Sequence, residues 1–191
     1  MFTEILTESL HLRNLKVTDA ERIFEYRSHP DVARFQSWGT QSAEAIQSYI
    51  REATEPGQPG SWYQIGIVLL SSGELIGDCG FRVLETEPHQ AEVGISLAPE
   101  FQGEGYATEA LRALLNYLFV TLGKDLVFGS VDPHNGRSMR LLQRVGMRKE
   151  SEFLKSRWFK GELVDDEIFA ITASEWKSMN PGNRPPKPRT D

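Results

Sequence analysis

The chain has 191 residues, of which 39% are hydrophobic and 25% charged, an ordinary composition for one soluble domain with a hydrophobic core. Its formal net charge of −6 argues against a nucleic-acid partner, because broad phosphate contact needs clustered Lys and Arg. The lone Cys79 excludes an internal disulfide, no run of about eighteen apolar residues predicts a membrane span, and the first residues do not resemble a signal peptide. We therefore expect a cytoplasmic protein that does not bind membranes.

The first third of the chain predicts one strand and two helices. Residues 10–15 indicate a short opening strand, and Thr18 with Glu21 forms a capping-box pattern at the start of the first helix. The pair His29-Pro30 ends that helix. A second helix is expected after Ser42, where apolar residues recur at helical spacing.

Three β-rich segments follow. Residues 62–70 and 75–83 flank the turn Ser71-Ser72-Gly73 and predict a hairpin. Residues 91–97 predict a further strand, in which alternate side chains point to opposite faces of the sheet. One face receives Val93, Ile95 and Leu97, and the other receives Glu92, Gly94 and Ser96.

The second half of the chain predicts a strand-helix-strand unit and a closing hairpin. Apolar residues at helical spacing predict an amphipathic helix over 107–122 that ends at Gly123. The nearly all-apolar segment 126–131 is typical of a parallel strand covered on both faces, so a right-handed parallel unit is expected. The remaining elements are a helix at 135–145 and a hairpin of strands 153–159 and 167–171.

The turn Gln102-Gly103-Glu104-Gly105-Tyr106-Ala107 connects the predicted strand at 91–97 to the following helix. Unpaired backbone N–H groups and the positive end of the helix dipole meet at such a turn, which favours phosphate. Glycine at 103 and 105 permits close backbone approach and unusual dihedral angles. Two glycines alone are equally compatible with an ordinary helix start. The third glycine of a dinucleotide fingerprint and the Gly-Lys-Ser/Thr of a nucleoside triphosphate loop are both absent.

The turn resembles the Gln/Arg-x-x-Gly-x-Gly/Ala signature of the GCN5-related N-acetyltransferase (GNAT) superfamily at Gln102, Gly105 and Ala107. A second segment resembles the coenzyme A element that follows it in this superfamily, namely Asn135-Gly136-Arg137-Ser138 with Leu141, Gly146 and Met147. The resemblance covers about residues 10–176, and two segments are most similar to the RimJ/RimL-like branch: Leu12-Arg13 and Ala91-Glu92-Val93-Gly94.

The resemblance implies a fold, a cofactor and a reaction. The fold is a mixed α/β domain over 1–178, with a twisted, mostly antiparallel sheet of six or seven strands, flanking helices and a splayed central parallel pair. Residues 179–191 form a Pro-rich tail that we expect to be extended or disordered. The reaction is acetyl transfer from acetyl-coenzyme A, without a metal, to a primary amine of a protein N-terminus or a small molecule. Whether the chain pairs as a homodimer is left open.

The resemblance also assigns residues to the cofactor. The coenzyme A pyrophosphate is expected on the backbone amides of the turn, and the pantetheine arm near the backbone of Leu97. Asn135 is expected to bind the arm through its amide, although it could instead serve only as a helix N-cap. The pyrophosphate-binding residues are Gln102, Gly103, Glu104, Gly105, Tyr106 and Ala107.

Three side chains are candidates for proton transfer. Glu92 is the first candidate for the general base, because it precedes the cofactor end of its strand, although an exposed carboxylate or an ion pair would explain it equally well. Asp132, after the next strand, is the second candidate. Ser138 is the candidate that protonates the departing thiolate, because Leu141-Leu142 stand where many GNAT proteins have a Tyr.

Aromatic residues could wall the acceptor site, and each could equally belong to the core: Phe35, Trp38, Trp158 and Phe159. Two rival functions use the same residues. A sensor that binds acyl-coenzyme A without turnover would need the turn but no proton-transfer groups. A hydrolase would use Ser138 as nucleophile with His134 as base, although no nucleophile elbow surrounds this serine.

Overall fold

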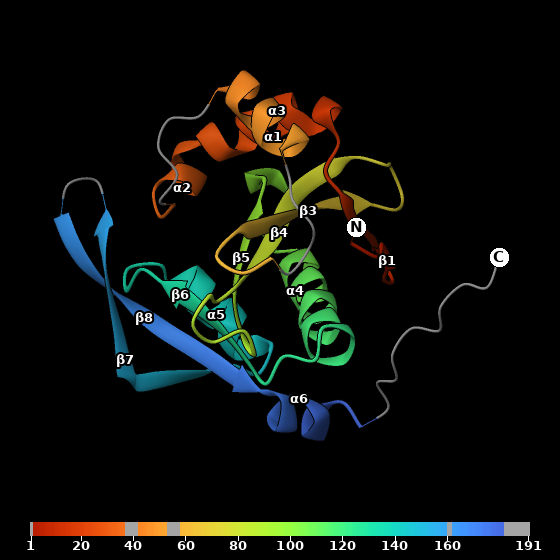
Figure 1. Ribbon diagram of the computed structural model, residues 1–191. Coiled ribbons are helices and arrows are strands. Elements are labelled where there is room, and N and C mark those ends of the chain that lie inside the picture. Colours follow the sequence, from red (N-terminus) through yellow and green to blue (C-terminus); the bar gives the residue numbers. More distant parts are fainter. Residues whose placement is uncertain (1, 37–41, 53–57, 160–161, 182–191) are drawn as a thin grey trace.

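The computed structural model describes residues 2–36, 42–52, 58–159 and 162–181, with only the backbone described over 151–159 and 162–164. The described strands form one mixed sheet, in which β5 and β6 are parallel and all other neighbours antiparallel (Figure 1). Its order is β1-β2-β3-β4-β5-β6-β8-β7. The strands are β1 (Ile5–Leu6), β2 (Leu10–Asn14), β3 (Trp62–Leu69), β4 (Leu75–Val83), β5 (Gln90–Leu97), β6 (Leu126–Val131), β7 (Arg148–Phe159) and β8 (Glu162–Thr172).

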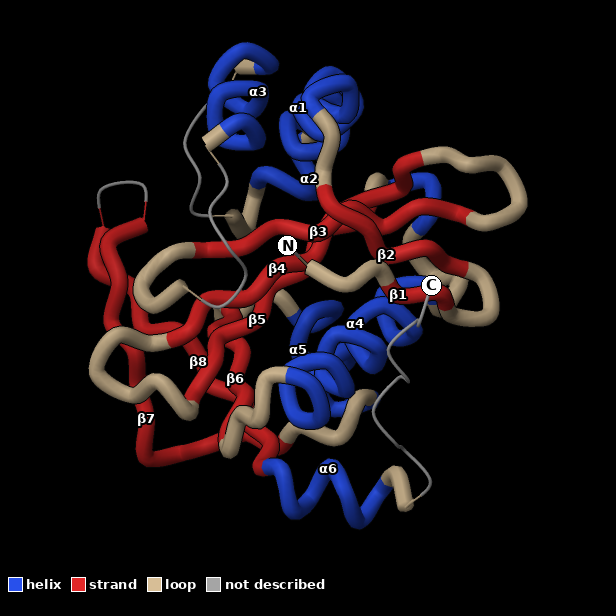
Figure 2. Tube along the Cα trace, turned by 45° about the vertical axis from the view of Figure 1, so that its right-hand side comes forward, coloured by secondary structure: helices blue, strands red, loops and turns tan. Residues whose placement is uncertain are grey.

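Helices flank the sheet on both faces. The segments α1, α2 and α3 lie together on one side, α4 and α5 on the other, and α6 follows the end of β8 (Figures 1 and 2). A 3₁₀ turn at Val17–Asp19 precedes α1, a second one at Pro99–Phe101 precedes the glycine turn, and a π-helical turn at Tyr117–Thr121 extends α4. The helices are α1 (Ala20–Ser28), α2 (Pro30–Ala33), α3 (Ala43–Arg51), α4 (Tyr106–Asn116), α5 (Gly136–Arg144) and α6 (Ala173–Met179).

Two hydrophobic cores hold the helices on the sheet. In the larger core, Leu111 and Leu114 of α4 pack with Ile65 and Phe81 of the sheet. Burying such a side chain contributes about 2 kcal/mol relative to leaving it exposed. The smaller core joins α1 and α3 to the opposite face and contains Ile23, Tyr26, Ile46, Val68 and Leu75. The predicted fold of a mostly antiparallel sheet with flanking helices and one central parallel pair is confirmed.

The parallel pair separates along its length. The register between β5 and β6 runs from Gln90 opposite Leu126 to Glu92 opposite Phe128, and both strands continue beyond it. On its other side β5 stays paired with β4 as far as Leu97. The predicted splay therefore opens immediately after Glu92.

Several predicted boundaries were wrong. The two-residue strand β1 adds an eighth strand to the predicted six or seven, pairing Ile5 with Leu12. The predicted capping box of Thr18 and Glu21 does not cap α1. The N-cap of this helix is Asp19, whose carboxylate instead accepts hydrogen bonds from Lys16 N at 2.7 Å and from Arg13 at 2.7 and 3.0 Å. This local ion pair uses the carboxylate that would otherwise cap the helix.

The last hairpin is longer than predicted, and a helix follows it. Its strands begin at Arg148 and Glu162, where polar residues hide the period-two pattern. Lys149 donates to Glu167 at 2.8 Å across the two strands, so charged pairs stabilise this part of the ladder. The unpredicted α6 begins with a capping box between Thr172 and Glu175, a signal that is visible in the sequence.

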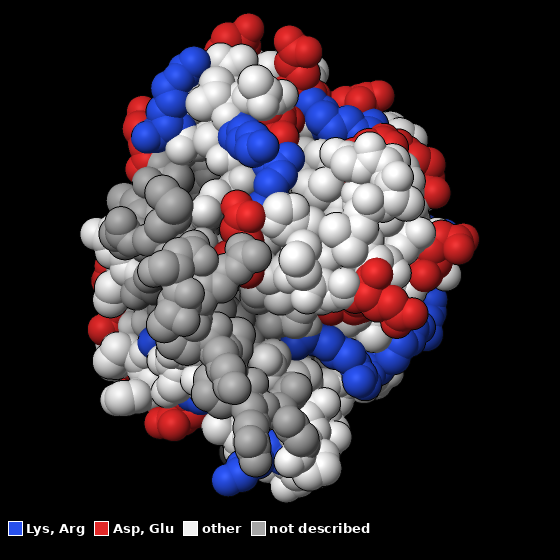
Figure 3. Space-filling view, turned by 90° about the vertical axis from the view of Figure 1, so that its right-hand side faces the viewer, with Lys and Arg blue, Asp and Glu red and all other residues white. Residues whose placement is uncertain are grey.

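The charges on one face and the length of the helices are relevant to nucleic-acid and membrane partners. On the face drawn in Figure 3, acidic and basic side chains are interspersed and form no large basic patch. No helix in the described ranges is long and apolar enough to cross a membrane.

Candidate functional site

The glycine turn presents a row of backbone amides. Gly103 and Gly105 have φ values of 93° and 90°, in the left-handed region that favours glycine, and Gly105 is the N-cap of α4. The amides of Thr108 and Glu109 donate back to the Gly105 carbonyl at 2.9 and 3.1 Å. Within the described residues, no hydrogen bond uses the amides of 103–107. The turn therefore has the donors and the helix dipole that an anion requires.

Gln102 fixes the turn to its neighbours through its side chain. Its Nε2 donates to the Leu97 carbonyl at 3.0 Å, and its Oε1 accepts from Arg137 Nη1 at 3.2 Å. Its own amide donates to the Pro99 carbonyl at 3.2 Å. Gln102 thus links the end of β5 to the start of α5, while the amides that follow it stay available.

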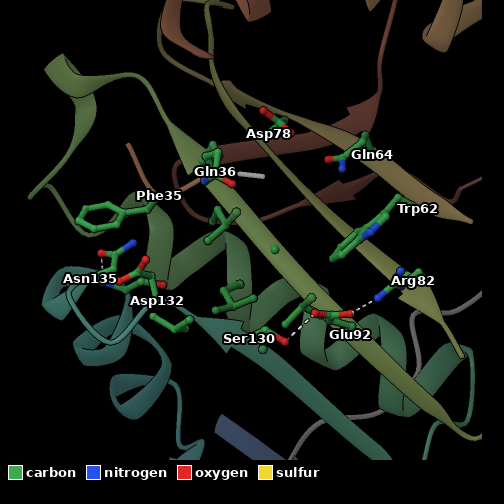
Figure 4. A pocket seen from close by; sticks show the side chains of 18 of the residues that line it. Phe35, Gln36, Trp62, Gln64, Asp78, Arg82, Glu92, Ser130, Asp132 and Asn135 are labelled. Carbon is green, nitrogen blue, oxygen red and sulfur yellow. Dashed lines mark hydrogen bonds and ion pairs between the residues drawn. The ribbon is translucent and has the colours of Figure 1, made fainter. Parts of the chain in front are cut away.

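A cavity of about 580 Å³ passes through the sheet where β5 and β6 separate. Leu111, Ser138 and Leu142 line it from the helices α4 and α5, and Trp62 and Glu92 line it from the strands on the opposite face. Figure 4 shows Phe35, Asp132 and Asn135 near one end and Trp62, Arg82 and Glu92 near the other. The sheet therefore allows two molecules to meet from opposite faces.

The start of α5 brings two predicted residues together. Asn135 is the N-cap, and its Oδ1 accepts a hydrogen bond from the Ser138 amide at 3.1 Å. Capping occupies only the oxygen of the carboxamide, which leaves its NH₂ group for a ligand. Leu142 packs beside Gly129, since a Cβ built on this glycine would lie 3.1 Å from Leu142 Cδ1. A hydrocarbon side chain therefore occupies this part of the cavity wall.

Glu92 is buried and held from two sides. Arg82 forms an ion pair with its Oε2, and Ser130 Oγ donates to its Oε1 at 2.8 Å. The expectation of an exposed strand carboxylate is therefore wrong, because only 6% of Glu92 is accessible. The ion-pair interpretation is confirmed, and the same carboxylate also lines the cavity where the splay begins.

Asp132 lies at the end of β6 and lines the cavity near Asn135 (Figure 4). Its Oδ1 accepts hydrogen bonds from the His134 amide at 2.8 Å and from His134 Nδ1 at 3.0 Å. The imidazole of His134 is exposed and is oriented by Asp132. In the described part of the chain it forms no hydrogen bond with Ser138, as a hydrolytic Ser-His pair would require.

A buried polar group joins α1 to the cavity wall. Asp78 accepts from Tyr26 Oη at 2.6 Å and from Arg27 Nη2 at 2.5 Å. Burial, together with the charge of Asp78, raises the pKa of Tyr26 well above its ordinary value. Burial also raises the pKa of the neighbouring Cys79 thiol, whose side chain lies in the core, so this cysteine is no candidate nucleophile.

The predicted aromatic wall is described only in part. Phe35 lines the cavity, whereas Trp38 and the side chains of Trp158 and Phe159 lie outside the described residues. Sequence reasoning missed several cavity residues because strand register and the packing of α1 on the sheet bring them together, not sequence proximity: Arg27, Trp62, Gln64, Asp78 and Arg82. Within the described ranges, no group of His, Cys, Asp and Glu side chains has the arrangement of a metal site.

Comparison with known proteins agrees with this geometry. The model of the acetyltransferase (GNAT) domain matches residues 9–148, so the chain belongs to the GNAT family of acyltransferases. An uncharacterized N-acetyltransferase p20 from Bacillus licheniformis is 29% identical over 90% of the chain and 97% of its own length. The ribosomal protein uS5-alanine N-acetyltransferase of Escherichia coli is 30% identical over 61% of each chain. The relatives thus include RimJ/RimL-like enzymes.

Solved structures share the fold. A GNAT-family acetyltransferase from Bacillus anthracis superposes with a TM-score of 0.78 at 26% identity, over 90% of this chain and 99% of that one. RimL, a ribosomal L7/L12 α-N-protein acetyltransferase in complex with coenzyme A, superposes with a TM-score of 0.76 at 18% identity. The superposition covers 89% of this chain and 98% of that one. At that identity the second likeness concerns the fold alone.

Proposed function

We propose that this protein transfers the acetyl group of acetyl-coenzyme A directly to a primary amine. One observation carries the proposal: a turn whose amides over 103–107 make no hydrogen bond within the described residues is tied through Gln102 to the end of β5 and the start of α5, and both elements line the cavity where the parallel strands separate. A phosphate-rich cofactor with a long arm fits the turn and the gap together. The amine can then approach the end of the arm from the opposite face.

The cofactor end would be held mainly by backbone. The amides of Gly103 to Ala107 would bind the pyrophosphate at the positive end of α4, with Gln102 holding the turn in place. The arm would follow β5 beyond its last pairing with β6, near the backbone of Leu97. The NH₂ group of Asn135, which makes no hydrogen bond within the described residues, would donate to an amide carbonyl of the arm.

Proton transfer would involve one residue on each side of the gap. As the amine nitrogen attacks the thioester carbonyl, a C–N bond forms, and collapse of the tetrahedral intermediate breaks the C–S bond. Glu92 would accept the proton that the amine loses, since its carboxylate lines the cavity where β5 and β6 separate. Ser138 would protonate the departing thiolate and regain a proton from solvent.

Asp132 is the alternative base. It lies near Asn135 and the start of α5, whereas Glu92 lies beside Trp62 and Arg82 at the other end of the cavity (Figure 4). Glu92 borders the point at which β5 and β6 separate, where the thioester would enter the gap. We therefore retain Glu92 as base and expect Asp132 to have the smaller effect on rate.

The acceptor would be a protein N-terminus or a small amine. A free α-amine, with a pKa near 8, needs less deprotonation at neutral pH than a Lys side chain near 10.4. The similarity to the ribosomal protein uS5-alanine N-acetyltransferase, whose acceptor is a protein, supports the first choice.

An acceptor panel tests the proposal. Acetyl-coenzyme A is mixed with peptides and small amines, free thiol is measured, and coenzyme A binding is measured by calorimetry. Amine-dependent thiol release supports the transferase. Binding of coenzyme A without thiol release over the whole panel would instead indicate a sensor, and release without any amine would indicate a hydrolase.

A further inference from the structure

The acceptor end of the cavity is built from rows of residues that face one another across β3, β4 and β5. The first row contains Trp62, Arg82 and Glu92, and the next contains Gln64, Gly80 and Gly94. Side chains two residues apart on a strand point to the same face, so both rows face the cavity. Because the second row has glycine on two of its three strands, β4 and β5 contribute no side chain there.

The neighbouring side chains lie down over these two glycines. A Cβ built on Gly80 would come within 2.7 Å of Gln64 Oε1, and a Cβ on Gly94 would lie 3.6 Å from the edge of the Trp62 ring. A larger residue at 80 would therefore displace the Gln64 carboxamide. The glycines let Gln64 and Trp62 form adjacent parts of one wall, and both line the cavity (Figure 4).

The Trp62 ring is held in place before any ligand arrives. The guanidinium of Arg82 lies 5.4 Å from the ring centroid, and Tyr49 Oη donates to the Trp62 carbonyl at 2.9 Å. Arg82 is in turn paired with Glu92. A rigid aromatic surface next to the candidate base loses little entropy when an acceptor packs on it.

Both arginines that line the cavity are engaged in ion pairs within the protein. Arg27 is paired with Asp78, and Arg82 with Glu92, so each guanidinium faces a carboxylate. Gln64 is different, because its carboxamide makes no hydrogen bond within the described residues, although it borders the cavity. Its complement is a neutral group with both a donor and an acceptor, which is an amide. A free carboxylate on the acceptor would instead lie near Asp78 and Glu92, the negatively charged partners in the two ion pairs.

We propose that Gln64 and Trp62 form an acceptor subsite for an amide group next to the reacting amine, as in a peptide N-terminus. The inference rests on the proposed acetyl transfer and narrows its acceptor to aminoacyl amides. Gln64 hydrogen-bonds the first amide, while Trp62 packs against the first side chain. Both are specificity-determining residues that take no part in proton transfer.

The test compares alaninamide with alanine methyl ester in the wild-type protein and in Gln64→Leu. The ester keeps the amine and the side chain but lacks the amide N–H group. We expect Gln64→Leu to lower kcat/KM about tenfold for alaninamide and less than about threefold for the ester, the size of one lost hydrogen bond. Because each acceptor is compared with itself, differences in amine pKa cancel.

Gln143→Leu, on the exposed side of α5, is the matched control and should change neither acceptor. Trp62→Leu should raise the KM of alaninamide about tenfold without changing the KM of acetyl-coenzyme A. In Trp62→Phe, the KM of alaninamide should return most of the way to the wild-type value. Equal losses on amide and ester in Gln64→Leu, with coenzyme A affinity intact, would overturn the subsite and leave the transferase standing. A wild-type protein that releases no thiol with any amine would overturn both.

Discussion

The two ends of the cavity are built by different means. At the proposed cofactor end, consecutive amides of one turn and the capped start of α5 would supply the contacts, so two short segments determine it. At the proposed acceptor end, β3, β4, β5 and α1 contribute side chains that meet only through strand register and the packing of α1 on the sheet.

The difference predicts different responses to mutation. Backbone donors do not depend on side-chain identity, so residues 103–107 of the turn should tolerate most substitutions except those that place bulk or charge on the glycines. The acceptor end depends on particular side chains in two ion pairs and one carboxamide. Single substitutions there should change acceptor kinetics while coenzyme A affinity stays the same.

The largest effect is expected from Gly105→Asp. The new side chain would point into open space at the anion site and place a carboxylate against the phosphates, which costs several kcal/mol. We expect coenzyme A affinity in calorimetry to fall about 1,000-fold or more. Gly73→Asp is the control, because Gly73 also has a positive φ, of 73°, and open space around it, but lies in the β3–β4 turn. Equal affinities in the two variants would exclude the turn as the phosphate site.

Glu92→Gln should have the next largest effect. Loss of a general base lowers kcat about 100-fold or more at pH 7. The deficit should shrink as the pH rises past the amine pKa, near 8 for an α-amine, because less of the amine then needs deprotonation. A pH profile of kcat for Glu92→Gln and Asp132→Asn measures this. A larger loss of kcat in Asp132→Asn would indicate that Asp132, at the proposed cofactor end, is the base instead of Glu92.

Ser138→Ala should reduce kcat about tenfold, because a hydrogen bond to a developing thiolate is lost. Coenzyme A affinity should stay within about threefold of wild type, since the Ser138 contact to Asn135 is made by the backbone amide. Stopped-flow thiol release is the measurement, with Ser178→Ala in α6 as control. An unchanged kcat would leave thiolate protonation to solvent.

The smallest effect on the reaction is expected from Tyr26→Phe, which removes a buried hydrogen bond to Asp78 and should cost about 1–3 kcal/mol of unfolding free energy. Because the folded pKa of Tyr26 is raised, its contribution is fully present below the unfolded pKa near 10 and is lost as the pH rises toward the folded value. Urea unfolding at pH 8 and 10.5 should show a smaller alkaline loss in the variant. An identical alkaline loss would contradict this assignment.

The sequence predicted the local structure of the proposed cofactor end better than that of the proposed acceptor end, for a physical reason. A turn and a helix cap depend on residues close together in the chain, so Gly105 and Asn135 could be assigned to local structures that are now observed. Trp62 and Gln64 became wall residues only because β4 and β5 contribute glycines opposite Gln64. Register over long sequence separations is not encoded in any local pattern.

The parallel pair and its flanking helices were predictable from apolar periodicity, whereas the polar starts of β7 and β8 were not. The capping box of α6 was visible but missed. Glu92 was placed on the correct face, yet its partners Arg82 and Ser130 could not be anticipated, because they lie on separate strands. The domain bounds, cytoplasmic location, tail conformation and homodimer stay predictions.

The most direct test of the central claim is a mass balance in a single turnover. Enzyme in excess over acetyl-coenzyme A is mixed with alaninamide, and thiol and N-acetylalaninamide are quantified over time. Direct transfer predicts one acetylated amide for each thiol released, and neither product when the amine is omitted. Thiol released without amine, or bound acetyl-coenzyme A that never releases thiol, would contradict it.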